Sequence, residues 1–200
     1  MKLASCVLCV AALLQVGCSS MRLVDTDVTS FTPATAKAVN VPASYRFERL
    51  PSQQARAEQQ AQLEGLAVPV LSMFGLSRNE QAAQYSVQIE VRVQQDTADV
   101  WESPWFGVSR HHFIGYGFGW GRFGRVGTVA IHTDFPAYRR EVAVVMRSLP
   151  DNQIVYESRA QHEGRWSDDA AIVPAMLQAA LNGFPKAPPG LRKVNIEIPR

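Results

Sequence analysis

Residues 85–94 read YSVQIEVRVQ, and this stretch decides the fold class of the whole chain. Apolar or aromatic side chains alternate with polar ones along its entire length. Successive side chains of a β-strand point to opposite faces of a sheet, so a strict period of two predicts a strand. One face of this strand meets an apolar core and the other meets water. A sheet with one polar face carries helices on its other face only.

Segments elsewhere in the chain show the same alternation. Two of them, 138–149 and 154–163, flank residues 150–153 (PDNQ), whose composition is that of a turn. This order predicts a β-hairpin. Further strands are expected at 45–49, 128–135 and 193–199.

Two segments have helical spacing. Residues 53–64 are rich in Gln, Ala, Arg and Glu, and the apolar residues that follow keep helical spacing around Pro69. A kinked or two-part helix ending at Gly75 is therefore predicted. Residues 167–169 (SDD) begin a second helix that Gly183 closes. The order of elements predicts an α+β fold, a two-layer sandwich of a mostly antiparallel sheet with helices on one face.

Composition limits the classes of partner. The chain has 200 residues, 46% hydrophobic and 19% charged, which suits one globular domain. The formal net charge is only +2, so nothing indicates a nucleic-acid partner.

The first residues are typical of a secretory signal. Met1 and Lys2 precede an apolar run, 3–16, which is shorter than the roughly 20 residues that a bilayer-spanning helix needs. A buried N-terminal helix is the less favoured alternative, because the run has no polar face. Residues 14–18 (LQVGC) resemble a bacterial lipobox, although Gln15 stands where Leu, Val or Ile is usual. This resemblance implies removal of residues 1–17 as a signal peptide and acylation of Cys18, for instance with palmitate.

The cysteines agree with lipidation. Cys6 and Cys9 lie in the apolar run, so Cys18 is the only cysteine expected in the mature chain. Each buried CH₂ of its acyl chains contributes about 0.8 kcal/mol to membrane binding. Ser19 follows where retention in the inner membrane usually has Asp, and by that resemblance the periplasmic face of the outer membrane of a Gram-negative bacterium is expected. Residues 18–44 are interpreted as a lipidated N-terminus and tether, within which 23–28 can pair as an edge strand. Residues 45–200 are interpreted as a single domain.

The segment from about 101 to 127 within that domain is rich in glycine and aromatic residues. Eight aromatic residues lie between 101 and 124, against 9 Phe, 5 Tyr and 4 Trp in the whole chain. Residues 119–124 (GWGRFG) fit the G-x-G-x-x-G spacing, but no buried strand precedes them and no helix follows, so nucleotide binding is rejected. A long loop between two strands is predicted.

Two roles remain open for this loop. Its rings either fold back over the open face of the sheet or form an exposed surface for an envelope protein, a glycan or the lipid interface. The candidate binding residues are Trp105, Arg110, His111, His112, Tyr116, Trp120 and Arg122.

Catalytic and metal-binding patterns are not found in the sequence. His111 and His112 are adjacent, so on an extended segment they point to opposite sides. His132 and His162 fall on separate expected strands, and capping of a helix explains the Asp168–Asp169 pair. No metal, cofactor or catalytic residue is assigned, and a binding or structural role is expected. The alternative is a periplasmic enzyme with an unrecognised active site in the 101–127 loop.

The order of several short motifs resembles a known family. These motifs are Val24–Asp27, Tyr45–Phe47, Gly75–Leu76, Tyr85–Val87, Ile154–Ala160 and Gly183–Pro185. Together with the glycine- and aromatic-rich middle, they resemble the bacterial lipoproteins that carry domain of unknown function 4136. Tyr156 stands where members often have Trp. The resemblance implies an anchored envelope protein and assigns no activity, so no catalytic residue is carried over.

Overall fold

The computed structural model describes residues 20–96, 114–116, 129–131, 137–186, 188 and 190–200. These residues form nine strands and three helices of a mixed α and β fold. The elements are β1 (Met21–Phe31), β2 (Ala43–Phe47), α2 (Pro51–Gln54), α3 (Ala57–Met73), β3 (Leu76–Arg78), β4 (Tyr85–Asp96), β5 (Ile114–Tyr116), β6 (Val129–Ile131), β7 (Ala137–Ser148), β8 (Ile154–Gly164), α4 (Asp169–Ala180) and β9 (Leu191–Pro199). No helix among them is long and apolar enough to cross a membrane.

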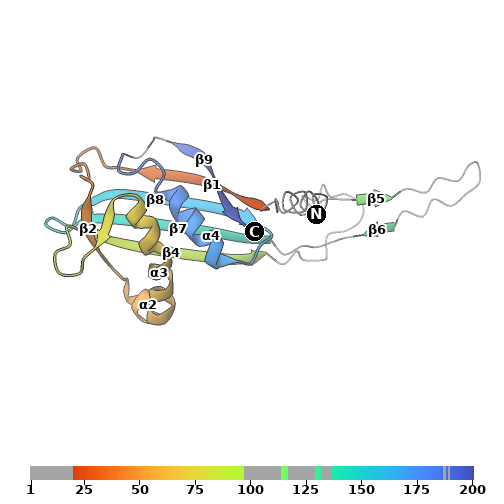
Figure 1. Cartoon of the computed structure of the whole chain (residues 1–200), viewed down its shortest axis with the longest axis horizontal. Helices are drawn as coiled ribbons and strands as arrows, with labels where there is room; N and C mark the ends of the chain where they lie inside the picture. Colours follow the sequence, from red (N-terminus) through yellow and green to blue (C-terminus); the bar gives the residue numbers. More distant parts are fainter. Residues whose placement is uncertain (1–19, 97–113, 117–128, 132–136, 187, 189) are drawn as a thin grey trace, which may run out of the picture.

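The main sheet is mixed, which corrects the expectation of a mostly antiparallel sheet. Its seven strands lie in the order β3-β2-β4-β7-β8-β1-β9 (Figure 1). β2 pairs in parallel with both β3 and β4, whereas the pairings from β4 to β9 are antiparallel. The connection between β2 and β3 is a helical crossover. It carries the chain back to the end of the sheet where β2 begins, so β3 runs in the same direction as β2.

The crossover consists of α2 and α3, which confirms the expected helical segment. Its break falls at Ala55 and Arg56, and α3 continues through Gly65 and Pro69. The helix ends where the sequence places its stop, at Gly75 with a φ of +78°.

β1 is an inner strand, which corrects the expectation that residues 23–28 form an edge strand. It lies between β8 and β9, and β9 forms the edge. Val24, Thr26 and Val28 are buried in alternation, so this strand has a core-facing side as regular as that of β4. The chain therefore enters the sheet at Met21.

The predicted hairpin is confirmed by β7 and β8, and β4 pairs with β7 from Tyr85↔Ser148 to Asp96↔Ala137. Residues 97–136 thus leave the sheet and return to it at one point. Within this segment β5 and β6 pair with each other as a separate two-stranded sheet. The strand expected at 128–135 is described only over β6.

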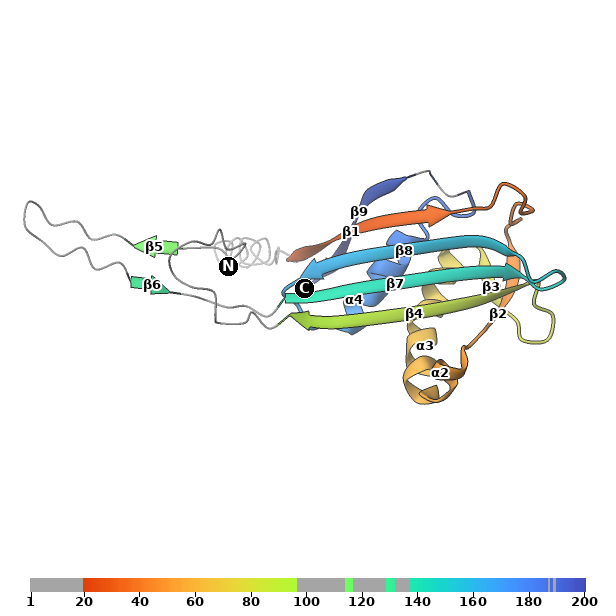
Figure 2. The same ribbon diagram turned by 180° about the vertical axis from the view of Figure 1, so that it is seen from behind.

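The helices α3 and α4 lie on one face of the main sheet, in front of it in Figure 1 and behind it in Figure 2. The core between them includes Leu71 of α3, Met176 and Leu177 of α4, and Ile89 and Val144 of the sheet. Ion pairs run across the other face. They include Glu90–Arg92, Glu141–Arg159, Arg139–Glu163 and Asp27–Lys193.

Candidate functional site at the loop end of the sheet

The sheet has two different ends. At the loop end, β1 begins, β9 finishes, and residues 97–136 leave and return, as the pairs Met21↔Pro199 and Asp96↔Ala137 show (Figure 1). At the turn end, β7 and β8 are joined by the tight turn after Ser148.

The sequence-predicted candidate residues belong to the segment that leaves from the loop end. Trp105, Arg110, His111, His112, Trp120 and Arg122 lie outside the described residues, as does Cys18. Tyr116 is the last residue of β5, where its backbone pairs with Val129.

A fully buried arginine organises the loop end. Arg140 points from β7 toward α4, where its Nε donates to Asp169 Oδ1 (2.7 Å) and its Nη2 donates to the Trp166 carbonyl (2.6 Å). Its guanidinium also lies 5.1 Å from the centroid of the Tyr138 ring. In the part of the chain that the structure describes, its Nη1 is buried without a hydrogen-bond partner.

Two aspartates at the start of α4 accept hydrogen bonds from the arginines of the loop end. One carboxylate oxygen of Asp168 accepts from the Ala171 amide and caps the helix, and the other accepts from Arg22. The hydrogen bond from Arg22 holds the pKa of Asp168 below its ordinary value. Asp168 thus joins α4 to β1, much as Asp169 joins it to β7.

Trp166, just before α4, lies between two arginines. The guanidinium carbons of Arg22 and Arg200 are 5.7 and 5.3 Å from its ring centroid. The side chain is 46% exposed, so the ring has an arginine-lined part and a part open to solvent. An exposed indole beside a guanidinium presents an apolar ring and a charged group together. Such a pair suits contact with a surface that is partly apolar and partly polar.

His162 is a buried histidine held by the backbone. Its Nδ1 lies 2.7 Å from the Asp25 carbonyl oxygen, and it faces Arg140 across the strand pair. A Cβ at position 164 would come within 2.7 Å of the His162 Nε2, so a side chain there would have to displace the His162 ring. Among the described residues, no three His, Cys, Asp or Glu side chains group as metal ligands.

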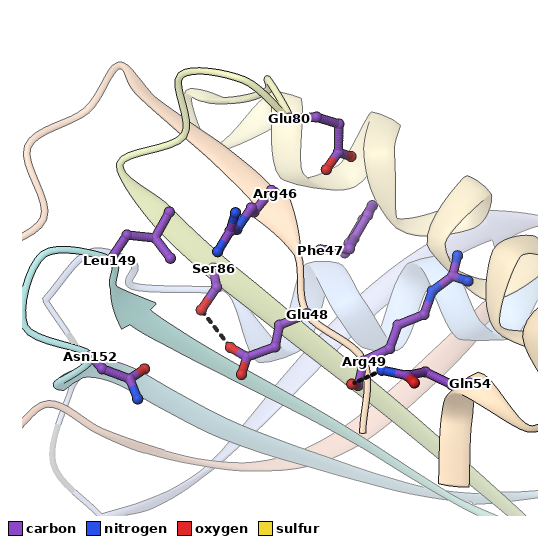
Figure 3. A pocket seen from close by; sticks show the side chains of 9 residues that line it. All are labelled: Arg46, Phe47, Glu48, Arg49, Gln54, Glu80, Ser86, Leu149 and Asn152. Carbon is purple, nitrogen blue, oxygen red and sulfur yellow. Dashed lines mark hydrogen bonds between the residues drawn. The ribbon is translucent and has the colours of Figure 1, made fainter. Parts of the chain in front are cut away.

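A groove of about 590 Å³ opens at the turn end, and Figure 3 shows its side chains. Two hydrogen bonds cross its wall: Ser86 donates to Glu48 (2.6 Å), and the Gln54 side-chain amide donates to the Arg49 carbonyl (3.2 Å). It is lined by Arg46, Phe47, Glu48, Arg49, Gln54, Glu80, Ser86, Leu149 and Asn152.

A second groove, of about 600 Å³, runs between α2, α3 and β4. The side-chain amides of Gln53 and Gln60 donate to the Ile89 carbonyl oxygen at 2.8 and 3.2 Å. These bonds take the place of the neighbouring strand that β4 lacks beyond its pairing with β2. The two glutamines thus satisfy a backbone carbonyl at the edge of the sheet.

Sequence reasoning missed the residues that build the loop end, namely Arg22, Arg140 and Trp166. One signal was present, because Arg140 occupies a core-facing position in the alternation of β7, between Tyr138 and Val142. A charge at such a position has to find a buried partner. Asp168 and Asp169 were identified as capping residues, and the structure adds an arginine to each of them.

Comparisons with known proteins place the chain in a family. The sequence profile of the domain of unknown function DUF4136 matches residues 28–186, so the chain belongs to that family. No curated protein matches the chain.

The likenesses to solved structures are distant. A PDZ domain protein from Parabacteroides distasonis ATCC 8503 is 9% identical, with a TM-score of 0.46, over 95% of this chain and 42% of that one. This chain therefore spans less than half of that protein. The PelC dodecamer from Paraburkholderia phytofirmans is 11% identical, with a TM-score of 0.42, over 80% of this chain and 98% of that one. These likenesses carry no functional conclusion.

Proposed function

We propose that the protein is a lipid-anchored module of the bacterial cell envelope that acts by binding. One observation carries the proposal: Cys18, which ends a lipobox-like segment, stands three positions before Met21, where the folded sheet begins. A signal-like segment that stops just before a stable strand fits a mature chain that starts at the cysteine. The proposed location is the periplasmic face of the outer membrane.

The binding role is assigned to the segment between β4 and β7. A long aromatic segment carried on a rigid sheet is a common arrangement for recognition. Its proposed partner is an envelope protein or a glycan, contacted through the seven candidate residues named above. The alternative, an enzyme that uses His111 or His112, remains a prediction, because both residues lie outside the described part.

We also propose that the helices and the main sheet make only two layers. The ion pairs on the helix-free face support this, because such exposed pairs keep their solvation only if no further layer covers them. A cysteine-reactive probe should therefore label an Arg159→Cys variant without denaturant. Protection of that thiol in the folded protein would contradict the two-layer arrangement.

Metabolic labelling with radioactive palmitate tests the anchor. Wild-type protein should take up label and sediment with outer-membrane vesicles on a sucrose gradient. A Cys18→Ala variant should do neither, whereas a matched Cys9→Ala variant should behave like the wild type. Lack of label in the wild type, or identical fractionation of wild type and Cys18→Ala, would overturn the proposal.

A further inference from the structure

The N-terminal end of the described chain is fixed to the sheet. The Arg200 amide donates to the Ser20 carbonyl (3.0 Å), and Met21 pairs with Pro199. Only two residue steps separate Ser20 from Cys18, and two extended residues span at most about 7 Å. An acylated Cys18 would therefore hold the loop end of the sheet directly against the bilayer.

The side chains at this end suit a bilayer surface. Trp166 presents a half-exposed indole, and tryptophan is enriched at the level of lipid headgroups. On the opposite face of the sheet, Met21 and Leu23 are 50% and 53% exposed, although both are apolar. Apolar and aromatic groups thus flank the sheet end on both of its faces.

Arg200 differs from Arg22 and Arg140 in its charge partners. Asp168 accepts from Arg22, and Asp169 accepts from Arg140, so these two arginines are matched by carboxylates. Arg200 is exposed and contacts the Trp166 ring, and no carboxylate pairs with it among the described residues. An exposed guanidinium of this kind readily binds the phosphate oxygens of a headgroup.

We propose that Met21, Arg22, Leu23, Trp166 and Arg200, here called the membrane patch, lie in the headgroup layer of an anionic phospholipid membrane. This inference rests on the proposed lipid anchor and specifies how the anchored domain is oriented. The strands stand on the membrane by their loop end, and the turn end points away from it. Arg200 contacts lipid phosphate, while Trp166, Met21 and Leu23 contact the boundary between headgroups and acyl chains.

Spin labels on single cysteines test the orientation in the full lipidated protein. Leu23→Cys places a label in the patch, and Leu191→Cys is the matched control, because Leu191 is 73% exposed on the same sheet face. Leu191 pairs with Thr29, six residues along β1 from Leu23, or about 20 Å away. Both variants are reconstituted into vesicles of phosphatidylethanolamine and phosphatidylglycerol.

The expected result is a contrast between the two labels. The label at position 23 should become several-fold more accessible to oxygen, relative to a water-soluble nickel chelate, when vesicles are present. The label at 191 should not change. Equal access of the chelate to both labels in vesicles would overturn the proposed orientation.

A charge variant tests the contact with phosphate. Arg200→Ala should reduce the affinity of the membrane patch for phosphatidylglycerol about fivefold, read as the phosphatidylglycerol content of the vesicles needed for half-maximal change at label 23. Arg46→Ala is the matched control, since Arg46 is exposed at the turn end and should have no effect. An equal phosphatidylglycerol content at half-maximal change for both variants would show that Arg200 does not contact lipid phosphate.

The anchor is read separately in the same preparations. Wild-type protein takes up no spin label if the Cys18 thiol is acylated, and mass spectrometry measures the acyl mass. An unacylated chain would overturn the proposed function together with the orientation. An acylated chain with a water-exposed label at 23 would overturn the orientation alone.

Discussion

Among the described residues, two of the ion pairs that join the sheet region to a helix have opposite burial of the cation and the anion. At the loop end, the cation Arg140 is fully buried and its partner Asp169 is half-exposed. In the second pair, the anion Glu64 of α3 is buried. Its partner Arg49, which follows β2, is partly exposed and donates two hydrogen bonds of 2.6 and 2.7 Å to it. A buried carboxylate can become neutral by binding a proton, whereas a guanidinium stays charged. Buried Arg140 therefore depends on its half-exposed partner Asp169 more strictly than a buried carboxylate depends on an exposed cation.

The largest effect is expected from Asp169→Ala. Among the described residues, this variant leaves the buried Arg140 guanidinium with only the Trp166 carbonyl as a hydrogen-bond acceptor. We expect a loss of about 2–3 kcal/mol in the free energy of unfolding, the lower part of the range for breaking a buried pair, because Asp169 is half-exposed. Urea denaturation measures it. The control Glu163→Ala, in an exposed pair with Arg139, should change stability by less than about 0.5 kcal/mol. Equal losses would contradict the comparison.

The second effect comes from the pair with the buried carboxylate. Arg49→Ala should lower the Tm by about 5 °C at pH 7, because Glu64 is left as a buried, unpaired carboxylate. Calorimetric scans at pH 7 measure the shift, and a Tm equal to that of the wild type would contradict the comparison.

Two buried tyrosines extend the comparison to neutral groups. The Tyr156 hydroxyl donates to the Ala180 carbonyl (2.8 Å), whereas the Tyr45 hydroxyl is buried without a partner among the described residues. Tyr156→Phe should therefore cost about 1 kcal/mol, and Tyr45→Phe should be neutral or stabilising. Denaturant unfolding of the two variants measures this difference. A larger loss for Tyr45→Phe would show that its hydroxyl has a partner.

A titration at alkaline pH tests the burial of the Tyr45 hydroxyl. Burial raises the pKa of Tyr45 from 10.0 to about 12. Because the folded state disfavours the ionised phenol, this contribution to stability is complete below pH 10 and is lost as the pH rises toward 12. Absorbance titration should show one tyrosine ionising late in the folded wild type, and Tyr45→Phe should remove it. Persistence of the late phase would assign it to another tyrosine.

The smallest effect concerns Asp168, whose two oxygens have separate partners. Asp168→Asn should keep the helix cap and lose the charge pair with Arg22, at about 0.5 kcal/mol, whereas Asp168→Ala should lose both, at about 1 kcal/mol. Since the pKa of Asp168 is lowered from 3.8, the stability from ionisation is present above that pH and lost as the pH falls through the folded value. Unfolding at pH 7 and pH 2.5 measures this. An Asp168→Ala deficit of the same size at both pH values would exclude the ionised carboxylate as its source.

Local patterns predicted some elements well. The alternation in β4, the turn composition after Ser148 and the cap at Asp168 each depend on neighbouring residues, and each is found where the sequence places it. The parallel pairing of β2 and the inner position of β1 were missed. Alternation shows that a segment is a strand and which side chains share a face, but it does not show which strand lies beside it.

The sequence by itself determined the period of the long strands, the starts and stops of the helices, and the family to which the chain belongs. The tertiary structure alone decided the strand order and the partners of Arg140, Glu64 and Trp166. These contacts join residues as far apart as Arg22 and Asp168, which are 146 positions apart in sequence. Their formation depends on which faces are brought together when the core is buried, because a charge removed from water has to be matched by whatever group the packing places beside it.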